Sequence, residues 1–298
     1  MQYLLPNIKQ GEVKALARAI SFVENEVEGY EDLLLGIDAP SGKKVVGITG
    51  PPGAGKSTLV DALIHLLVSE GKRVGILCVD PSSPFNLGAL LGDRIRMSDW
   101  YTHKQVYIRS LASRGSVGGL NPKIIEITDL MKLAPFDHII VETVGVGQTE
   151  IEIAGLADTT VVVMVPEGGD EVQTMKAGLM EIADVFVVNK GDRPGADAFV
   201  HNLEAMLAPA FYHKGAEIAI VKTTASEQKG IQELWDKILQ HQALNEQADR
   251  QLSLLAEKAY QLIRHKKMDG INKRELKIAI KEAQVEGFNL YQFIRKWT

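Results

Sequence analysis

The chain has 298 residues, of which 45% are hydrophobic and 24% charged, a composition typical of a globular protein with one large domain and attachments. Its net charge of −5 at pH 7 does not indicate a general affinity for nucleic acid. The single cysteine, Cys78, has no partner for a disulfide within the chain and is expected to be a small buried side chain. No stretch approaches the ~18 consecutive apolar residues of a membrane span, and the first residues show no signal-peptide pattern, so a reducing, cytoplasmic location is expected.

The two ends of the chain have helical patterns of different charge. Residues 1–40 contain the amphipathic stretch VKALARAISFVENE and carry three Lys or Arg against seven Asp or Glu. Residues 245–298 carry eleven Lys or Arg against seven Asp or Glu. These opposite charges suit pairing within one chain or between two chains, although two solvated helical surfaces explain the same pattern.

The middle of the chain alternates short apolar runs, rich in Val and Ile, with helical patterns. Continuous apolar runs of this kind are typical of parallel strands that are buried on both faces. We therefore predict an α/β fold, a doubly wound and mostly parallel sheet over residues 41–244, with helical extensions at 1–40 and 245–298. The expected strands are 43–49, 73–80, 136–143, 159–166, 184–190 and 217–223, with 105–110 as a further candidate.

The first expected strand leads into GPPGAGKST, which fits the phosphate-loop pattern G-x-x-x-x-G-K-S and opens a helix. Glycines at 50, 53 and 55 let backbone N–H groups turn toward phosphate oxygens, and the helix that begins at Lys56 directs its positive dipole end at the same anion. Lys56 is expected to reach the β- and γ-phosphates, and the Ser57 hydroxyl to ligate Mg²⁺. The expected nucleotide contacts are Gly50, Pro51, Gly53, Ala54, Gly55, Lys56, Ser57 and Thr58.

A late strand ends in NKGD, and N-K-x-D in that place is typical of a guanine reader. The Asp192 carboxylate can accept hydrogen bonds from guanine N1–H and from the exocyclic amine, where adenine offers a lone pair and a C–H. The aliphatic stem of Lys190 can cover the base face. The expected base contacts are Asn189, Lys190 and Asp192, with backbone N–H groups of Thr224, Ala225 and Ser226 facing the guanine oxygen.

The apolar run at 136–143 ends in a carboxylate, Glu142, and VGVGQTE follows it. In a P-loop fold the strand beside the phosphate-loop strand ends in a carboxylate, usually Asp, that holds the metal through water, and this position falls here on Glu142. The glycines at 145 and 147 suit a switch loop that approaches the γ-phosphate and moves when it leaves. Gln148 is a candidate for orienting the attacking water, and a solvated strand-end acid is the alternative interpretation of Glu142.

Two more acidic residues are candidates for the metal site. Asp80 ends the strand at 73–80, and Asp93 lies in GDRIRM, a candidate first switch, so that either could bind Mg²⁺ or position water. The segment 166–178 leaves its strand through two glycines and is a candidate mobile segment. The expected catalytic residues are Lys56, Asp80, Asp93, Glu142 and Gln148, the expected metal ligands Ser57, Asp80, Asp93 and Glu142, and the polar contacts of 166–178 Asp170, Gln173 and Lys176.

Together these motifs resemble the MeaB/ArgK family, the GTPase chaperones of adenosylcobalamin-dependent acyl-CoA mutases. GPPGAGKST, VDPSSPF, GDRIRM, SRGSVGGL, ETVGVGQTE and NKGD occur in the family's order through most of the chain. The resemblance implies binding of GTP, GDP and Mg²⁺, and GTP hydrolysis coupled to loading and protection of the mutase. It also implies a homodimer through 245–298, and a relay of the nucleotide state to the mutase through 166–178. Mutases of methylmalonyl-CoA and of isobutyryl-CoA are both compatible clients.

Two other classes of protein contain the same phosphate loop. A metal-delivery GTPase, such as those serving nickel enzymes, should show a cluster of Cys and His, and the sequence contains no C-x-x-C. A P-loop kinase should have an acceptor pocket and a lid and would not need N-K-x-D.

Overall fold

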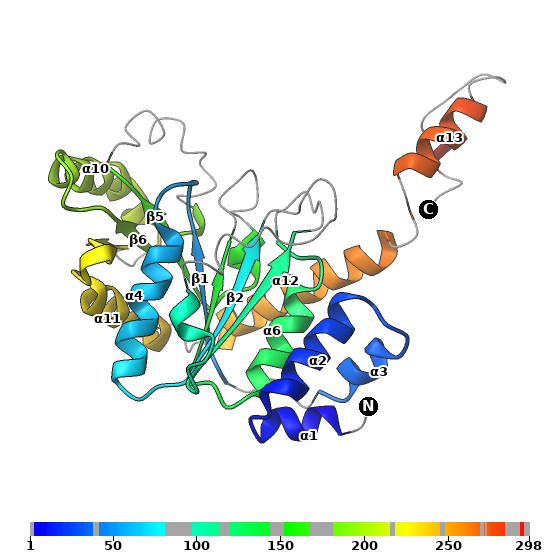
Figure 1. The fold of residues 1–298 in the computed structure, drawn as a ribbon. Helices are drawn as coiled ribbons and strands as arrows, with labels where there is room; N and C mark the ends of the chain where they lie inside the picture. The colour runs from blue at the N-terminus through cyan, green and yellow to red at the C-terminus, as the bar shows by residue number, and fades with distance from the viewer. Residues whose placement is uncertain are drawn as a thin grey trace. The chain divides into compact units, whose positions relative to one another are not determined.

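The computed structural model describes residues 3–37, 42–80, 97–113, 120–143, 152–166, 181–214, 218–244, 248–268, 271, 273–283 and 293–294. The chain divides into two compact units, residues 1–254 and 255–298. Figure 1 shows the sheet and the helices that cover it in the first unit.

The first unit is built on a sheet of seven parallel strands in the order β3-β2-β4-β1-β5-β6-β7. The predicted doubly wound α/β fold is therefore confirmed, and the run at 105–110 forms a strand of the sheet. The five inner strands are short and buried because helices cover both faces, while the edge strands β3 and β7 are partly exposed. The strands are β1 (Val45–Thr49), β2 (Val74–Asp80), β3 (Val106–Ala112), β4 (His138–Glu142), β5 (Thr159–Met164), β6 (Val185–Val188) and β7 (Ala219–Lys222).

The two faces of the sheet have different helical covers. Val161 and Val163 of β5 share one core with α4 (Lys56–Ser69) and α11 (Ile231–Leu244). Val162, between them, packs on the opposite face with α10 (Ala196–Lys214), as the alternation of side chains along a strand requires. On that second face, glycines at 47 and 75 leave room for η2 (Ile153–Gly155) and α6 (Ile124–Leu133). The remaining short helices are η1 (Ser98–Trp100) and η3 (Ala225–Glu227).

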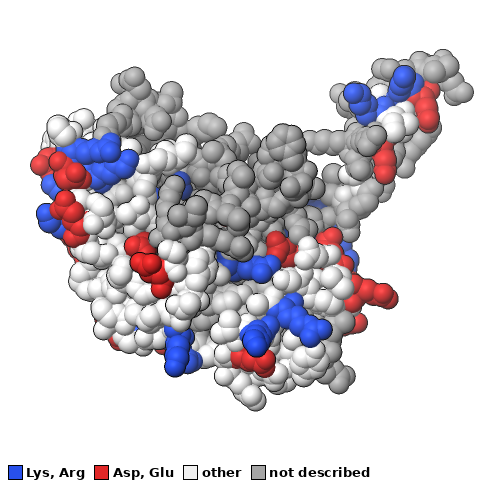
Figure 2. Space-filling model, in the orientation of Figure 1, with Lys and Arg blue, Asp and Glu red and all other residues white. Residues whose placement is uncertain are grey.

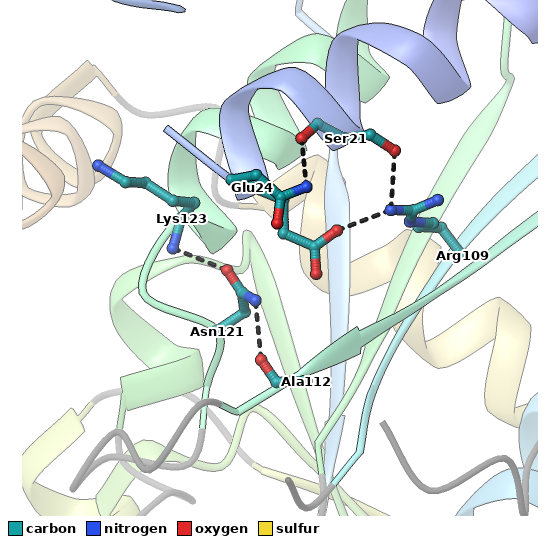
Figure 3. A network of polar contacts seen from close by, with 7 residues as sticks. Ser21, Glu24, Arg109, Ala112, Asn121 and Lys123 are labelled. Atoms are coloured by element: carbon teal, nitrogen blue, oxygen red, sulfur yellow. Dashed lines mark hydrogen bonds and ion pairs between the residues drawn. The ribbon is translucent and has the colours of Figure 1, made fainter. Parts of the chain in front are cut away.

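The N-terminal residues form α1 (Leu4–Lys9), α2 (Val13–Glu24) and α3 (Tyr30–Leu35) within the first unit. The apolar stripe of α2 is buried, and α2 packs against α6. Polar contacts join α2 to the sheet. The Arg109 guanidinium on β3 lies 2.7 Å from the Glu24 carboxylate and donates to the Ser21 hydroxyl at 3.1 Å (Figure 3). Helix α2 thus packs directly on α6 and β3 of the sheet domain, while the expected boundaries at 40/41 and 244/245 stay predictions.

The C-terminal helices are α12 (Ala248–Met268) and α13 (Lys273–Ala283). Several of their large apolar side chains are exposed, and those in the second unit include Leu255, Tyr260, Ile263 and Ile278. Acidic and basic side chains are interspersed over the part of the described surface visible in Figure 2. None of the helices in the described part of the chain is long and apolar enough to cross a membrane.

Candidate nucleotide and metal site

The phosphate loop joins the end of β1 to the start of α4 and depends on three glycines with positive φ angles, +137° at Gly50, +77° at Gly53 and +87° at Gly55. A Cβ at Gly50 would lie 2.1 Å from the carbonyl oxygen of Val163, and one at Gly55 would lie 2.4 Å from Nδ2 of Asn189. A Cβ at Gly53 would meet nothing within 4 Å. The loop is therefore tightly held at its two ends and open at Gly53, a shape that fits a phosphate group.

Lys56 is the first residue of α4, and its side chain is folded back into the loop. Its ammonium donates to the carbonyl oxygens of Gly50, at 2.9 Å, and Pro51, at 3.0 Å, and the residue is only 7% exposed. A buried cation at a helix N-terminus is well placed to bind an anion. The loop thus combines backbone N–H groups, a helix dipole and a lysine at one place.

Glu142 and Ser57 meet beside this loop. β4 is the direct neighbour of β1, with Glu142 in register with Ile48, so the strand-end carboxylate lies next to the phosphate loop. The Ser57 hydroxyl donates to Oε1 of Glu142 at 2.7 Å, and both residues are buried. The solvated strand-end acid that was the alternative for Glu142 is therefore wrong, because Glu142 is 3% exposed.

Asp80 ends β2, the strand on the other side of β4, two residues beyond the pairing of Cys78 with Glu142. It is buried at 4% exposure, and the backbone N–H of Ser113 donates to its carbonyl oxygen at 3.0 Å. The Ser57 hydroxyl at the start of α4 and the carboxylates that end β2 and β4 are hard oxygen ligands of the kind Mg²⁺ prefers, and Mg²⁺ takes its remaining ligands from water and phosphate. These donors fit a magnesium ion.

Asn189 connects the guanine-reading turn to the phosphate loop. Its buried side chain donates from Nδ2 to the Ala54 carbonyl oxygen at 3.0 Å. Its Oδ1 accepts from the Thr223 hydroxyl at 3.1 Å and from the backbone N–H of Ala225 at 3.2 Å. Asn189 therefore holds the phosphate loop, its own turn and the segment after β7 together, and its expected contact with the base stays a prediction.

The turn after Asn189 carries the remaining residues that the sequence predicts to contact the base. Lys190 has a φ of +57°, an uncommon conformation for a side chain of this kind, and Asp192 is exposed at the same edge of the sheet. The N–H of Thr224 donates to the Lys229 carbonyl oxygen at 3.1 Å, and that of Ala225 donates to Asn189. In this structure both N–H groups are engaged within the protein, and the contact of Thr224, Ala225 and Ser226 with the guanine oxygen stays a prediction.

Several predicted residues lie outside the described residues, and sequence analysis missed others. The expected switch and coupling residues Asp93, Gln148, Asp170, Gln173 and Lys176 lie outside them.

The residues that the sequence analysis missed are buried threonines: Thr223 contacts Asn189, and Thr143 contacts Thr49 between the ends of β4 and β1. Each of these threonines directly precedes or follows a site motif, and this position in the sequence was the signal that could have identified it. The residue that each threonine contacts depends on the order of the strands, which the sequence does not give.

A parallel sheet with a phosphate loop after β1, a buried carboxylate ending the adjacent strand and an N-K-x-D turn after β6 defines a P-loop GTPase. Comparison with known proteins places the chain more closely. It belongs to the family described as methylmalonyl Co-A mutase-associated GTPase MeaB, whose sequence profile matches residues 16–279. The predicted resemblance and the predicted GTPase activity are thereby confirmed.

Individual relatives agree with this placement. A putative GTPase of Pyrococcus abyssi is 48% identical over 251 residues, which cover 83% of this chain and 78% of the relative. The mouse protein named methylmalonic aciduria type A homolog, mitochondrial, is 37% identical over 208 residues, 67% of this chain and 49% of the relative. The solved structure of a LAO/AO transport system kinase is similar with a TM-score of 0.68 and 25% identity, covering 99% of this chain and 95% of that one.

Proposed function

We propose that this protein is a GTP-hydrolysing chaperone that binds a coenzyme B12-dependent acyl-CoA mutase and gates the loading and protection of its cofactor. The observation that carries the proposal is the family match, because the family is described as associated with methylmalonyl Co-A mutase. The relative named for methylmalonic aciduria supports the same class of partner. Methylmalonyl-CoA mutase or a related acyl-CoA mutase is the proposed client.

The described residues have distinct roles in this proposal. Lys56 and the loop from Gly50 bind the β- and γ-phosphates, and Asp192 reads the guanine edge. Ser57, Glu142 and Asp80 would hold Mg²⁺, which when bound supplies charge neutralisation at the phosphate oxygens. Since the Ser57 hydroxyl donates to Glu142 at 2.7 Å, this hydrogen bond must rearrange when Ser57 becomes a ligand. Asp93 and Gln148 are proposed to position the attacking water.

The C-terminal segment is proposed to form a homodimer, and residues 166–178 to relay the nucleotide state to the mutase through Asp170, Gln173 and Lys176. Support for the dimer comes from the second unit, where Leu255, Tyr260 and Ile263 of α12 are 57%, 61% and 56% exposed. Exposed apolar side chains on one helix are typical of an interface. The cytoplasmic location expected from the sequence stays a prediction.

The proposal is tested by measuring GTP turnover of the purified protein, alone and with a co-encoded B12-dependent acyl-CoA mutase. We expect a slow basal rate, on the order of 10⁻⁴–10⁻² s⁻¹ for a switch GTPase without a partner-supplied group, that rises several-fold with the mutase. Lys56→Ala serves as the inactive control. A rate that no such mutase changes would contradict the proposed client, and transfer of the γ-phosphate to an acceptor other than water would indicate a kinase.

The alternative of metal delivery has a separate readout. Among the residues that the structure describes, no group of three or more His, Cys, Asp and Glu is arranged to hold a metal ion. We therefore expect no stoichiometric binding of Ni²⁺ in equilibrium dialysis. Tight binding of Ni²⁺ that GTP releases would favour metal delivery instead.

A further inference from the structure

Two buried threonines join the ends of β1 and β4. The Thr143 hydroxyl donates to the Thr49 hydroxyl at 2.9 Å, and the Thr143 backbone N–H donates to the Ile48 carbonyl oxygen at 3.0 Å. The exposed fractions of Thr49 and Thr143 are 0% and 2%. Thr49 directly precedes Gly50 of the phosphate loop, and Thr143 directly follows Glu142.

We propose that Thr49 and Thr143 are positioning residues for the metal site, whose paired hydroxyls set the placement of Glu142 relative to the phosphate loop and Ser57. This inference deepens the proposed function and rests on the proposed magnesium site. Neither threonine needs to touch the metal or the nucleotide. Each acts through its neighbour in the chain, Thr49 through Gly50 and Thr143 through Glu142.

The geometry of the strand ends supports this role. Glu142 and Ile48 are in register, and the Glu142 side chain reaches Ser57 on α4, the helix that covers one face of the sheet. Because side chains alternate along a strand, the threonines point to the opposite face. The strand ends are thus fixed from both faces, by the contact of Ser57 with Glu142 on one side and by the threonine pair on the other.

The phosphate loop has little freedom to absorb a shift of Thr49. Gly50 passes so close to β5 that a Cβ there would lie 2.1 Å from the Val163 carbonyl oxygen. Three residues before Gly50, at Gly47, a Cβ would lie 2.5 Å from Cγ1 of Ile153. A displacement of Thr49 would therefore be passed on to Gly50, and one of Thr143 to Glu142. Mg²⁺ demands nearly ideal octahedral geometry, so small displacements of its ligands weaken it.

The hydroxyls can be removed while the shape of the side chain is kept. Thr143→Val and Thr49→Val each delete one partner of the hydrogen bond, and Thr143→Ser keeps the hydroxyl. The matched control is Thr128→Val on α6, because Thr128 is fully buried and its hydroxyl donates to the Ile124 carbonyl oxygen at 2.6 Å, away from the strand ends. Thermal unfolding of every variant shows how much stability each deletion costs.

The decisive measurement is the release of a fluorescent GDP analogue, in EDTA and in millimolar Mg²⁺, by stopped flow. In the wild-type protein Mg²⁺ should slow release, and we take the ratio of the two rates as the metal effect. Thr143→Val should reduce this ratio by about two- to tenfold, the range of one buried hydrogen bond, without changing the rate in EDTA. Thr49→Val should reduce the ratio to a similar extent and also release GDP faster in EDTA, because a shift of Thr49 reaches Gly50 of the phosphate loop. Thr143→Ser and Thr128→Val should keep the wild-type ratio.

The outcomes separate the positioning role from the metal site itself. If Thr143→Val loses stability as Thr128→Val does but keeps the wild-type ratio, the pair is only structural and the inference is overturned. If Thr143→Val speeds GDP release equally in EDTA and in Mg²⁺, the pair acts on the phosphate loop and not on the metal ligands, which also overturns it. If GDP release by the wild-type protein does not respond to Mg²⁺, the proposed magnesium site fails, and the positioning role fails with it.

Discussion

Replacing Asn189 by alanine removes a side chain that connects the phosphate loop to the N-K-x-D turn and to the segment 223–225. Its amide makes three hydrogen bonds, with Ala54, Thr223 and Ala225, at 3.0, 3.1 and 3.2 Å. Asn189 is 2% exposed, so water does not readily replace these bonds. We expect Asn189→Ala to lower both the free energy of unfolding and the affinity for GDP.

The size of the effect follows from the groups left without a partner. A buried polar group that loses its partner costs about 1–3 kcal/mol. The Thr223 hydroxyl can rotate to another acceptor, so the loss is concentrated at the Ala54 carbonyl and the Ala225 N–H. Two such groups give a destabilisation of roughly 2–6 kcal/mol, which corresponds to a decrease in melting temperature on the order of 3–10 °C for a chain of this size. The affinity for GDP should fall about tenfold or more, because the phosphate loop is no longer held to the base-binding turn.

The assay is a titration with a fluorescent GDP analogue at a temperature where each variant is folded, combined with thermal unfolding. Asn121→Ala is the matched control. Asn121 is also 2% exposed, and it donates to the Ala112 carbonyl oxygen at 2.8 Å and accepts from the Lys123 N–H at 2.8 Å (Figure 3). This control should lose comparable stability and keep its affinity for GDP. Equal losses of GDP affinity in the two variants, or none in Asn189→Ala, would refute the proposed role of Asn189.

Three further predictions concern single side chains. Lys56→Ala should abolish productive GTP binding, since it removes the only cation shown inside the described phosphate loop, and equilibrium binding of a fluorescent GTP analogue that stays at the wild-type level would contradict this. Asp192→Asn should reduce the preference for GTP over ATP on the order of tenfold or more, because charge-assisted hydrogen bonds to guanine are lost; calorimetry with both nucleotides measures it, and unchanged selectivity would show that the base assignment is wrong. Burial at the start of β4 lowers the pKa of His138 below its ordinary 6.5, an effect that Lys72 reinforces and that the nearby carboxylates Asp137 and Glu70 oppose. The neutral imidazole is thus favoured in the folded state, so its stabilising contribution is present above pH 6.5 and is lost as pH falls through the lower folded pKa; the free energy of unfolding, measured with urea at pH 7.5 and below pH 6, should fall less in His138→Phe than in the wild-type protein.

Much of this fold was predictable from the chain alone, because local physical chemistry dictates it. Apolar runs of six to eight residues bounded by turns predicted the strands, with the run of β3 as a further candidate, and their lack of alternation indicated a sheet buried on both faces. The phosphate loop was recognised because its glycines, lysine and serine lie within eight consecutive residues, from Gly50 to Ser57. The Glu142 carboxylate was assigned to the same site because strand-end acids meet at one edge of a parallel sheet.

The tertiary structure decided what joins these motifs. Asn189 and Ala54 are separated by 135 positions in the chain, and Thr143 and Thr49 by 94, so no local pattern connects them. The contact of Arg109 with Glu24, across 85 positions, likewise depends on where α2 packs. The sequence by itself determined which chemical groups the protein carries and which strand ends present them. Only the strand order, with β4 and β5 on either side of β1, determined which of those groups touch, because hydrogen bonds act over about 3 Å and strand neighbours are set by long-range packing.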